Sequence, residues 1–226
     1  MIDATVTGTS AWLRARSDDV WATLVDHPFV AELAAGTLPL AKFRFYLEQD
    51  LLFLGDYARA IGLAVGRAAD EDELRELTRQ LATVVEEELE KERALLHRVE
   101  EMLGADPSPE PAPAPTTRAY STFLLATGAR GDALDVMTAL LPCAWSYADI
   151  GSTYLDSTTE HPVYADWMRL FGGGDYRDYV DRRRTAYDRS AARADAERRE
   201  RLHDLFQTAA RLEAAFWNMA YREEDR

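Results

Sequence analysis

The sequence has a single cysteine, a shortage of positive charge and no long apolar run, and each of these absences excludes a class of protein. One cysteine cannot form an intramolecular disulfide, which excludes a small secreted scaffold held by such bonds. With 40 acidic against 26 basic side chains, the formal charge of −14 disfavours nucleic acid or an anionic membrane as the main partner. No segment approaches the roughly 18 apolar residues of a membrane span, and residues 1–10 lack a signal-peptide pattern. We therefore expect a soluble, cytoplasmic protein.

Glycine and proline are also scarce, at 12 and 9 of 226 residues, and convincing strand-like alternation is hard to find. Five of the prolines fall between Asp106 and Pro115, where they block helix continuation and predict an extended loop. Because both flanking halves are equally helical, we interpret residues 106–115 as a surface loop of one domain that spans residues 1–226. The predicted fold is all-α, a helical bundle of about seven to eight helices.

The spacing of apolar residues and the turn signals between them place these helices along the chain. They are expected at about residues 10–35, 40–69, 71–103, 116–127, from 133 to beyond 154, 161–171, 175–186 and 190–221. Two runs of like charge, Glu86–Glu90 and Arg182–Arg184, are interpreted as solvated helix faces.

Two carboxylic acids interrupt apolar stripes, where a charge is costly to bury without a partner. Asp50 lies at the centre of a stripe with helical spacing that contains Phe43, Tyr46, Leu47, Phe53, Leu54, Tyr57 and Ile61. Glu213, on the last expected helix, shares a face with Leu202, Phe206, Ala209, Phe216 and Ala220. Burial would raise the proton affinity of such carboxyls, which could then act as acid or base near neutral pH. The alternatives are that Asp50 makes a structural hydrogen bond and that Glu213 reaches water from the stripe edge.

The only thiol, Cys143, directly follows a proline within the fifth expected helix. Pro142 removes a helical donor and bends the helix, a distortion that is common at functional sites. Tyr147 lies one turn beyond Cys143 on the same face. A lone cysteine is most often an inert core residue. Together with Asp50 and Glu213, however, Cys143 would form a pocket suited to a flat polar heterocycle, with the thiol as nucleophile.

Four segments of the chain resemble the TenA family, also called thiaminase II, whose all-helical fold is that of heme oxygenase. They are residues 27–60 (HPFVAELAAGTLPLAKFRFYLEQDLLFLGDYARA), 139–151 (ALLPCAWSYADIG), 161–173 (HPVYADWMRLFGG) and 213–221 (EAAFWNMAY). They occur in the family order over nearly the whole chain, and the first two are quite specific. The resemblance implies a heme-oxygenase-like bundle that needs no metal or other cofactor. It also implies a homo-oligomer, since family members commonly form homotetramers.

Members of this family hydrolyse the bond at the 5-methylene of a 4-amino-2-methylpyrimidine, which releases an amine from an aminomethylpyrimidine or the thiazolium from thiamin. By resemblance, Cys143 is the nucleophile that adds to the pyrimidine ring, and Glu213 moves protons at the leaving group and the amino group. Asp50 matches the aspartate that binds the pyrimidine edge, and Tyr120 and Tyr147 match aromatic residues of the pocket. The implied activity is that of an aminopyrimidine aminohydrolase in thiamin salvage.

Three positions depart from the family pattern. Phe53 and Phe171 occupy places where many members have a tyrosine in the substrate pocket, and Ala148 replaces a bulkier aromatic residue. Losing two hydroxyls keeps the stacking surface but removes hydrogen bonds worth roughly 0.5–1.5 kcal/mol each. A second hypothesis is therefore a pyrimidine-binding protein with weak or no activity, or with an altered substrate.

A third hypothesis is a metal-dependent oxidase on the same fold, because Glu90 and His97 are seven residues apart and can share a helix face. The sequence has only four histidines, which leaves too few ligands for a di-iron site. His97 is more simply interpreted as a hydrogen-bonded polar group within the bundle. The sequence also lacks a basic recognition helix for DNA. The leading hypothesis is a hydrolase whose partner is a small aminopyrimidine or thiamin.

Overall fold

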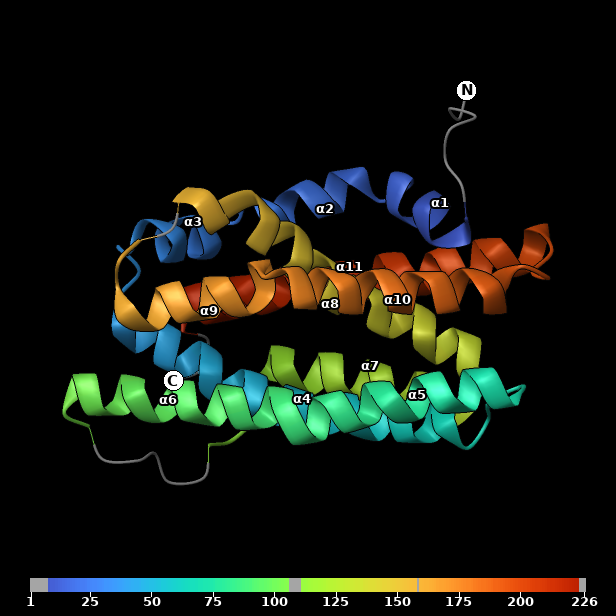
Figure 1. Cartoon of the computed structure of the whole chain (residues 1–226), viewed down its shortest axis with the longest axis horizontal. Helices are drawn as coiled ribbons and strands as arrows, with labels where there is room; N and C mark the ends of the chain where they lie inside the picture. Colours follow the sequence, from blue (N-terminus) through green and yellow to red (C-terminus); the bar gives the residue numbers. More distant parts are fainter. Residues whose placement is uncertain (1–7, 106–110, 158, 224–226) are drawn as a thin grey trace.

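A computed structural model describes residues 8–105, 111–157 and 159–223, and helices make up most of them (Figure 1). In chain order the α-helices are α1 (Thr9–Ala15), α2 (Asp18–Val25), α3 (Pro28–Ala35), α4 (Leu40–Val65), α5 (Glu71–Thr83), α6 (Leu89–Leu103), α7 (Pro115–Arg130), α8 (Ala133–Tyr154), α9 (Pro162–Gly172), α10 (Gly174–Ala191) and α11 (Ala196–Arg222). A short 3₁₀ helix (Leu155–Ser157) follows α8. The described residues contain no strand, so the prediction of an all-α fold is confirmed.

The segment expected as one helix over residues 10–35 is divided into three short helices. Pro28 disfavours helical geometry in the residue before it, and His27 is accordingly extended, with φ −65° and ψ 138°. The ring of His27 then accepts a hydrogen bond of 3.1 Å from the backbone N–H of Phe29, which caps α3. A second break lies at Ser17, whose backbone leaves the helical region between α1 and α2. The other seven expected segments are each present, with ends shifted by a few residues.

The helix expected over residues 71–103 is continuous, but its hydrogen-bonding pattern changes partway along. Between α5 and α6 the chain makes a π-helical turn, Val84–Glu88, which we call the π turn. Such turns insert an extra residue into a helix and often occur at functional sites. Here the π turn places Glu88 in the wall of a cavity, as described below.

Helices α4 and α8 hold the bundle together. In Figure 1, α9 and α10 run end to end across the middle, α6 and α5 run end to end along one side, and α1–α3 cover the other side. Helix α4 contacts α5, α6, α7, α8 and α11, and α8 contacts α2, α9, α10 and α11. The site described below lies where α4, α6, α8, α9, α10 and the π turn converge.

Two glycines allow α8 and α9 to cross in close contact. A Cβ atom placed on Gly151 would lie 2.5 Å from the Cα atom of Gly172, well inside van der Waals contact. The atoms that it would meet belong to backbone, which cannot rotate away as a side chain can. This crossing fixes the position of Phe171, the residue before Gly172, whose ring contacts Tyr147 at a centroid distance of 4.7 Å.

The proline-rich segment is described only in its second half. Residues 106–110 of the predicted loop lie outside the described residues, whereas residues 111–114 carry no helix or strand before Pro115 begins α7. The buried side chain of Gln49 holds this end of the loop. Its amide donates to the carbonyl of Ala112 (3.2 Å) and accepts from the backbone N–H of Ala114 (2.9 Å). Among the helices of the described residues, none combines the length and apolar character needed to cross a membrane.

Candidate active site

A cavity of about 420 Å³ is lined by residues of α4, α6, α8, α9, α10 and the π turn. Four of the seven predicted site residues line it: Asp50 from α4, Cys143 and Tyr147 from α8, and Phe171 from α9. The remainder of the wall consists of Leu54, Thr83, Glu87, Glu88, Lys91, Glu92, Arg169, Leu170, Gly173, Asp175, Tyr176, Tyr179 and Arg182. The predicted nucleophile and the predicted ring-binding carboxyl thus share one cavity.

The other three predicted residues form a buried cluster beside the cavity and are not among its lining residues. The hydroxyl of Tyr120 donates a hydrogen bond of 2.9 Å to Glu213 Oε2. The ring of Phe53 packs on that of Tyr120 at a centroid distance of 4.5 Å. Glu213 is only 2% exposed, so the alternative that it reaches water from the edge of its stripe is wrong.

Asp50 is tied to the wall of the cavity through Tyr46, a residue that sequence reasoning placed only in the apolar stripe. The hydroxyl of Tyr46 donates to Asp50 Oδ2 at 3.2 Å and lies 3.0 Å from the hydroxyl of Tyr147. It also accepts a hydrogen bond of 3.4 Å from the indole N–H of Trp167. Asp50 therefore makes the structural hydrogen bond that was the alternative for it, and it faces the cavity as well.

Both predicted carboxyls have pKa values near neutrality. Burial raises the pKa of Asp50 to about 7, although the hydrogen bond from Tyr46 opposes the rise. Burial raises the pKa of Glu213 to about 8; the hydrogen bond from Tyr120 opposes this rise and the charge of Asp50 adds to it. Each group can hence give or take a proton at neutral pH, which is the requirement for general acid–base work.

The thiol of Cys143 is not activated as a free thiolate. Burial raises its pKa well above the ordinary value, and the carboxyls of Glu213 and Asp50 raise it further. A neutral thiol becomes a nucleophile when a neighbouring base removes its proton during attack. The arrangement can therefore support nucleophilic attack that is coupled to proton transfer, with a carboxylate as the base.

The interpretation of two charge runs as solvated faces is wrong for one member of each. Glu88 lines the cavity, and Arg183 is 4% exposed in the interior. The guanidinium of Arg183 donates to the hydroxyls of Tyr57 (2.8 Å) and Tyr179 (3.1 Å). A helical-spacing test could have found Arg183, because Tyr179 and other buried residues of α10 share its face.

Glu92 is a further cavity residue that sequence reasoning missed. It lies on α6 and is 1% exposed. Buried Leu95 and Val99 follow it at helical spacing, so the apolar stripe could have revealed it. His97, in contrast, was expected within the bundle and is exposed; its Nε2 lies 3.4 Å from Glu101 Oε1. In the part of the chain that the structure describes, no three His, Cys, Asp or Glu side chains are grouped to hold a metal ion.

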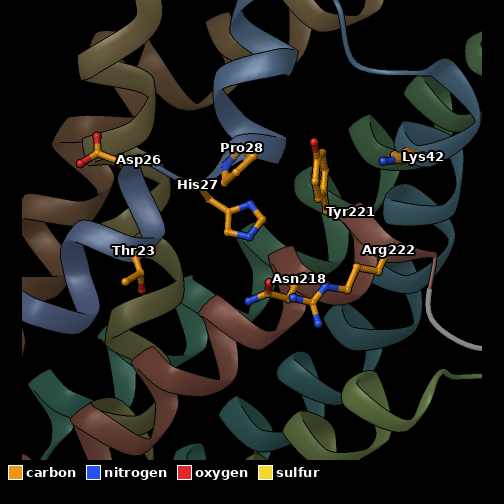
Figure 2. A pocket seen from close by; sticks show the side chains of 8 residues that line it. All are labelled: Thr23, Asp26, His27, Pro28, Lys42, Asn218, Tyr221 and Arg222. Carbon is orange, nitrogen blue, oxygen red and sulfur yellow. The ribbon is translucent and has the colours of Figure 1, made fainter.

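A second hollow, of about 700 Å³, lies elsewhere on the surface and is more open to solvent (Figure 2). It is lined by Thr23, Asp26, His27, Pro28, Lys42, Asn218, Tyr221 and Arg222. None of the predicted site residues belongs to it. The cavity of about 420 Å³ that Cys143 lines is therefore the candidate active site.

Comparison with known proteins agrees with this geometry. The sequence profile described as the TENA/THI-4/PQQC family matches residues 14–223. The chain belongs to this family. An aminopyrimidine aminohydrolase of Halalkalibacterium halodurans is 32% identical to this TenA-family chain over 216 residues, which cover 95% of this chain and 96% of the relative.

Solved structures show the same fold. A crystal structure from Silicibacter sp. TM1040, described as a TenA family transcription regulator, superposes with a TM-score of 0.85 at 32% identity and covers 96% of this chain and 97% of that chain. A domain of unknown function from Shewanella denitrificans, described as having a heme oxygenase-like fold, superposes with a TM-score of 0.70 at 13% identity, over 95% and 92% of the two chains. The predictions of a TenA-family sequence and of a heme-oxygenase-like fold are confirmed.

Proposed function

We propose that this protein is an aminopyrimidine aminohydrolase of the thiaminase II type, which hydrolyses the bond at the 5-methylene of 4-amino-2-methylpyrimidines with Cys143 as nucleophile. The observation that carries the proposal is the position of the only thiol, in the wall of one cavity together with Asp50, Tyr147 and Phe171. The relative from Halalkalibacterium halodurans, which bears that name and matches nearly the whole chain, supports the choice of reaction.

In the proposed reaction, the sulfur of Cys143 forms a bond to the pyrimidine ring while its proton passes to a carboxylate. The bond between the 5-methylene and the amine then breaks, and Glu213, which is protonated below about pH 8, gives the amine its proton. Water adds to the methylene and gives a proton to the ionised Glu213, the carbon–sulfur bond breaks, and the carboxyl that took the thiol proton returns it to the sulfur. The balance is one aminomethylpyrimidine and one water converted to one hydroxymethylpyrimidine and one ammonia.

The remaining predicted residues either bind the ring or position Glu213 in this proposal. Asp50 accepts and donates hydrogen bonds at the polar edge of the pyrimidine. Tyr147 and Phe171, in edge contact at 4.7 Å, supply an aromatic wall for the flat ring. Tyr120 orients Glu213 through its hydrogen bond, and the ring of Phe53 packs against that of Tyr120 and holds it in place.

The test is turnover of defined substrates by the purified chain. We expect release of hydroxymethylpyrimidine from 4-amino-5-aminomethyl-2-methylpyrimidine or from thiamin, measured by liquid chromatography, and none from the Cys143→Ser variant. Absence of turnover with both substrates, or equal turnover by the variant, would reject the proposal. Tight pyrimidine binding in calorimetry without turnover would instead select the binding protein that Phe53 and Phe171 suggest.

We further propose that residues 1–226 act as one domain, that the protein is cytoplasmic and that it forms a homotetramer. The network of contacts that α4 makes with α5, α6, α7, α8 and α11 supports one domain. The family supports the oligomer. The Silicibacter protein is described as a transcription regulator, but the formal charge of −14 disfavours DNA as a partner of this chain.

A further inference from the structure

The strongest unexplained feature of the cavity is the carboxyl group of Glu92. It lines the cavity that holds Asp50 and Cys143, and its residue is 1% exposed. Neither Oε1 nor Oε2 has a hydrogen-bond partner among the described residues. Most buried polar side-chain atoms in proteins have such a partner, and leaving one without it is costly. A carboxyl kept in this state at the wall of a cavity points to a ligand that completes its hydrogen bonds.

The surroundings of Glu92 favour its neutral form. Asp50 approaches from α4 and Glu88 from the π turn, and both are acidic. None of the ion pairs found among the described residues includes Glu92. Burial raises the pKa of Glu92 well above its ordinary value, and the charges of Asp50 and Glu88 raise it further. A neutral carboxyl carries one O–H donor and one carbonyl acceptor, whereas a carboxylate offers acceptors only.

This donor and acceptor set matches the substrate class of the proposed function. A 4-aminopyrimidine presents ring nitrogens that accept hydrogen bonds and an amino group that donates them. The ring nitrogens need a donor. The wall also carries Lys91 and Arg169, but both are exposed and pair with carboxylates, Glu87 and Asp166 respectively. A protonated Glu92 supplies that donor at a position where its own polar atoms are free.

We propose that Glu92 is a second substrate-binding carboxyl, which as a neutral acid donates a hydrogen bond to a ring nitrogen of the aminopyrimidine beside Asp50. The inference rests on the proposed function, because it takes the pyrimidine as the ligand. It assigns to α6 a direct part in recognition, whereas the resemblance assigned ring contacts to residues of α4, α7, α8, α9 and α11 only.

The experiment compares variants of Glu92 in their affinity for 4-amino-5-hydroxymethyl-2-methylpyrimidine, the reaction product. Glu92→Gln keeps a neutral donor and acceptor in the same shape, and Glu92→Met keeps the length but removes both. Glu92→Leu repeats the apolar test in case Glu92→Met does not fold. Glu90→Gln, which changes an exposed carboxyl two residues away, is the matched control. Calorimetry gives Kd, steady-state kinetics give KM and kcat, and thermal melts check folding.

We expect Glu92→Gln and Glu90→Gln to bind the product within about threefold of the wild type. Glu92→Met and Glu92→Leu should bind at least about tenfold more weakly, because a ring nitrogen loses its donor. The loss should appear in KM with kcat little changed, since the contact is present before and during the reaction. The apolar variants should melt no lower than the wild type, because no protein hydrogen bond to Glu92 is lost.

Two results would overturn the inference. Wild-type affinity in a folded Glu92→Met or Glu92→Leu variant would show that Glu92 does not contact the ligand. A tenfold loss in Glu92→Gln would show that an ionised carboxylate is required and would contradict the neutral donor. A wild-type protein that neither binds nor converts any aminopyrimidine would refute the proposed function itself, which is a separate outcome from either of these.

Discussion

Substituting Gly151 with alanine should both destabilise the fold and impair the site, because one methyl group would be forced into the α8–α9 crossing. The new Cβ would lie 2.5 Å from the Cα of Gly172, whereas nonbonded carbons prefer about 3.5–4.0 Å. The helices must therefore separate by about 1 Å. Overpacking of this kind costs about 1–3 kcal/mol, and contact with backbone places Gly151→Ala at the upper end.

The same shift carries Phe171 away from Tyr147 and disturbs the cavity wall. A displacement of about 1 Å at a catalytic site can reduce the rate about 100-fold. For a chain of this size about 3 kcal/mol corresponds to a fall in Tm of about 6–12 °C. Differential scanning calorimetry and kcat/KM for the aminomethylpyrimidine measure the two effects.

Gly62→Ala is the matched control for this substitution. Gly62 lies within α4, and nothing is within 4 Å of a Cβ placed on it. Alanine is the better helix former by about 1 kcal/mol, so this variant should melt at or above the wild-type temperature with unchanged activity. A Gly151→Ala protein that melts within 2 °C of the wild type (about 1 kcal/mol or less) and keeps its kcat/KM would refute the reasoning about the crossing.

Three further predictions concern protons and the loop. The pKa values of Asp50 and Glu213 are raised in the folded state to about 7 and about 8, so unfolding releases protons between about pH 4 and those values. Tm should therefore fall as pH rises through this window, and it should fall less steeply in Asp50→Asn. Equal slopes of Tm against pH in the two proteins would contradict this. Tyr120→Phe removes the hydrogen bond that lowers the pKa of Glu213, so the alkaline limb of the kcat/KM profile should move up by as much as about one pH unit; a downward shift would contradict the assignment. Gln49→Leu removes the acceptor of the Ala114 backbone N–H, which should cost about 2 kcal/mol and lower Tm by about 4–8 °C in thermal melts. An unchanged Tm would contradict this prediction.

Three predicted site residues were identified from a signal that is local to a helix, whereas Phe53, Tyr120 and Phe171 were identified by resemblance alone. Asp50 and Glu213 interrupt apolar stripes, and Cys143 follows a proline, so each is visible within a few turns of its own segment. The all-α class and the positions of most helices follow from the same helical spacing. Local breaks in that spacing are harder to see, as at His27, where a single proline divides what reads as one helix.

The residues that were misjudged depend on contacts between segments. Glu88 and Arg183 belong to charge runs, and the composition of a run predicts solvent exposure for all its members. Whether one member turns inward depends on the π turn for Glu88 and on the packing of α10 against α8 for Arg183. The charge composition of a run does not carry that information, whereas the helical spacing of Arg183 from buried Tyr179 does.

The chain of hydroxyls from Tyr147 through Tyr46 to Asp50 has a direction. The hydroxyl of Tyr46 has one proton, which it gives to Asp50, and the indole N–H of Trp167 can only donate. Tyr46 must therefore accept the proton of Tyr147 across their 3.0 Å contact. While Asp50 is ionised, the hydroxyl of Tyr147 can only accept hydrogen bonds from a ligand in the cavity. When Asp50 is protonated, the direction of these hydrogen bonds can reverse, and the hydroxyl of Tyr147 can donate to such a ligand. The charge of Asp50 on α4 thus decides whether the hydroxyl of Tyr147 on α8 accepts or donates a hydrogen bond at the cavity.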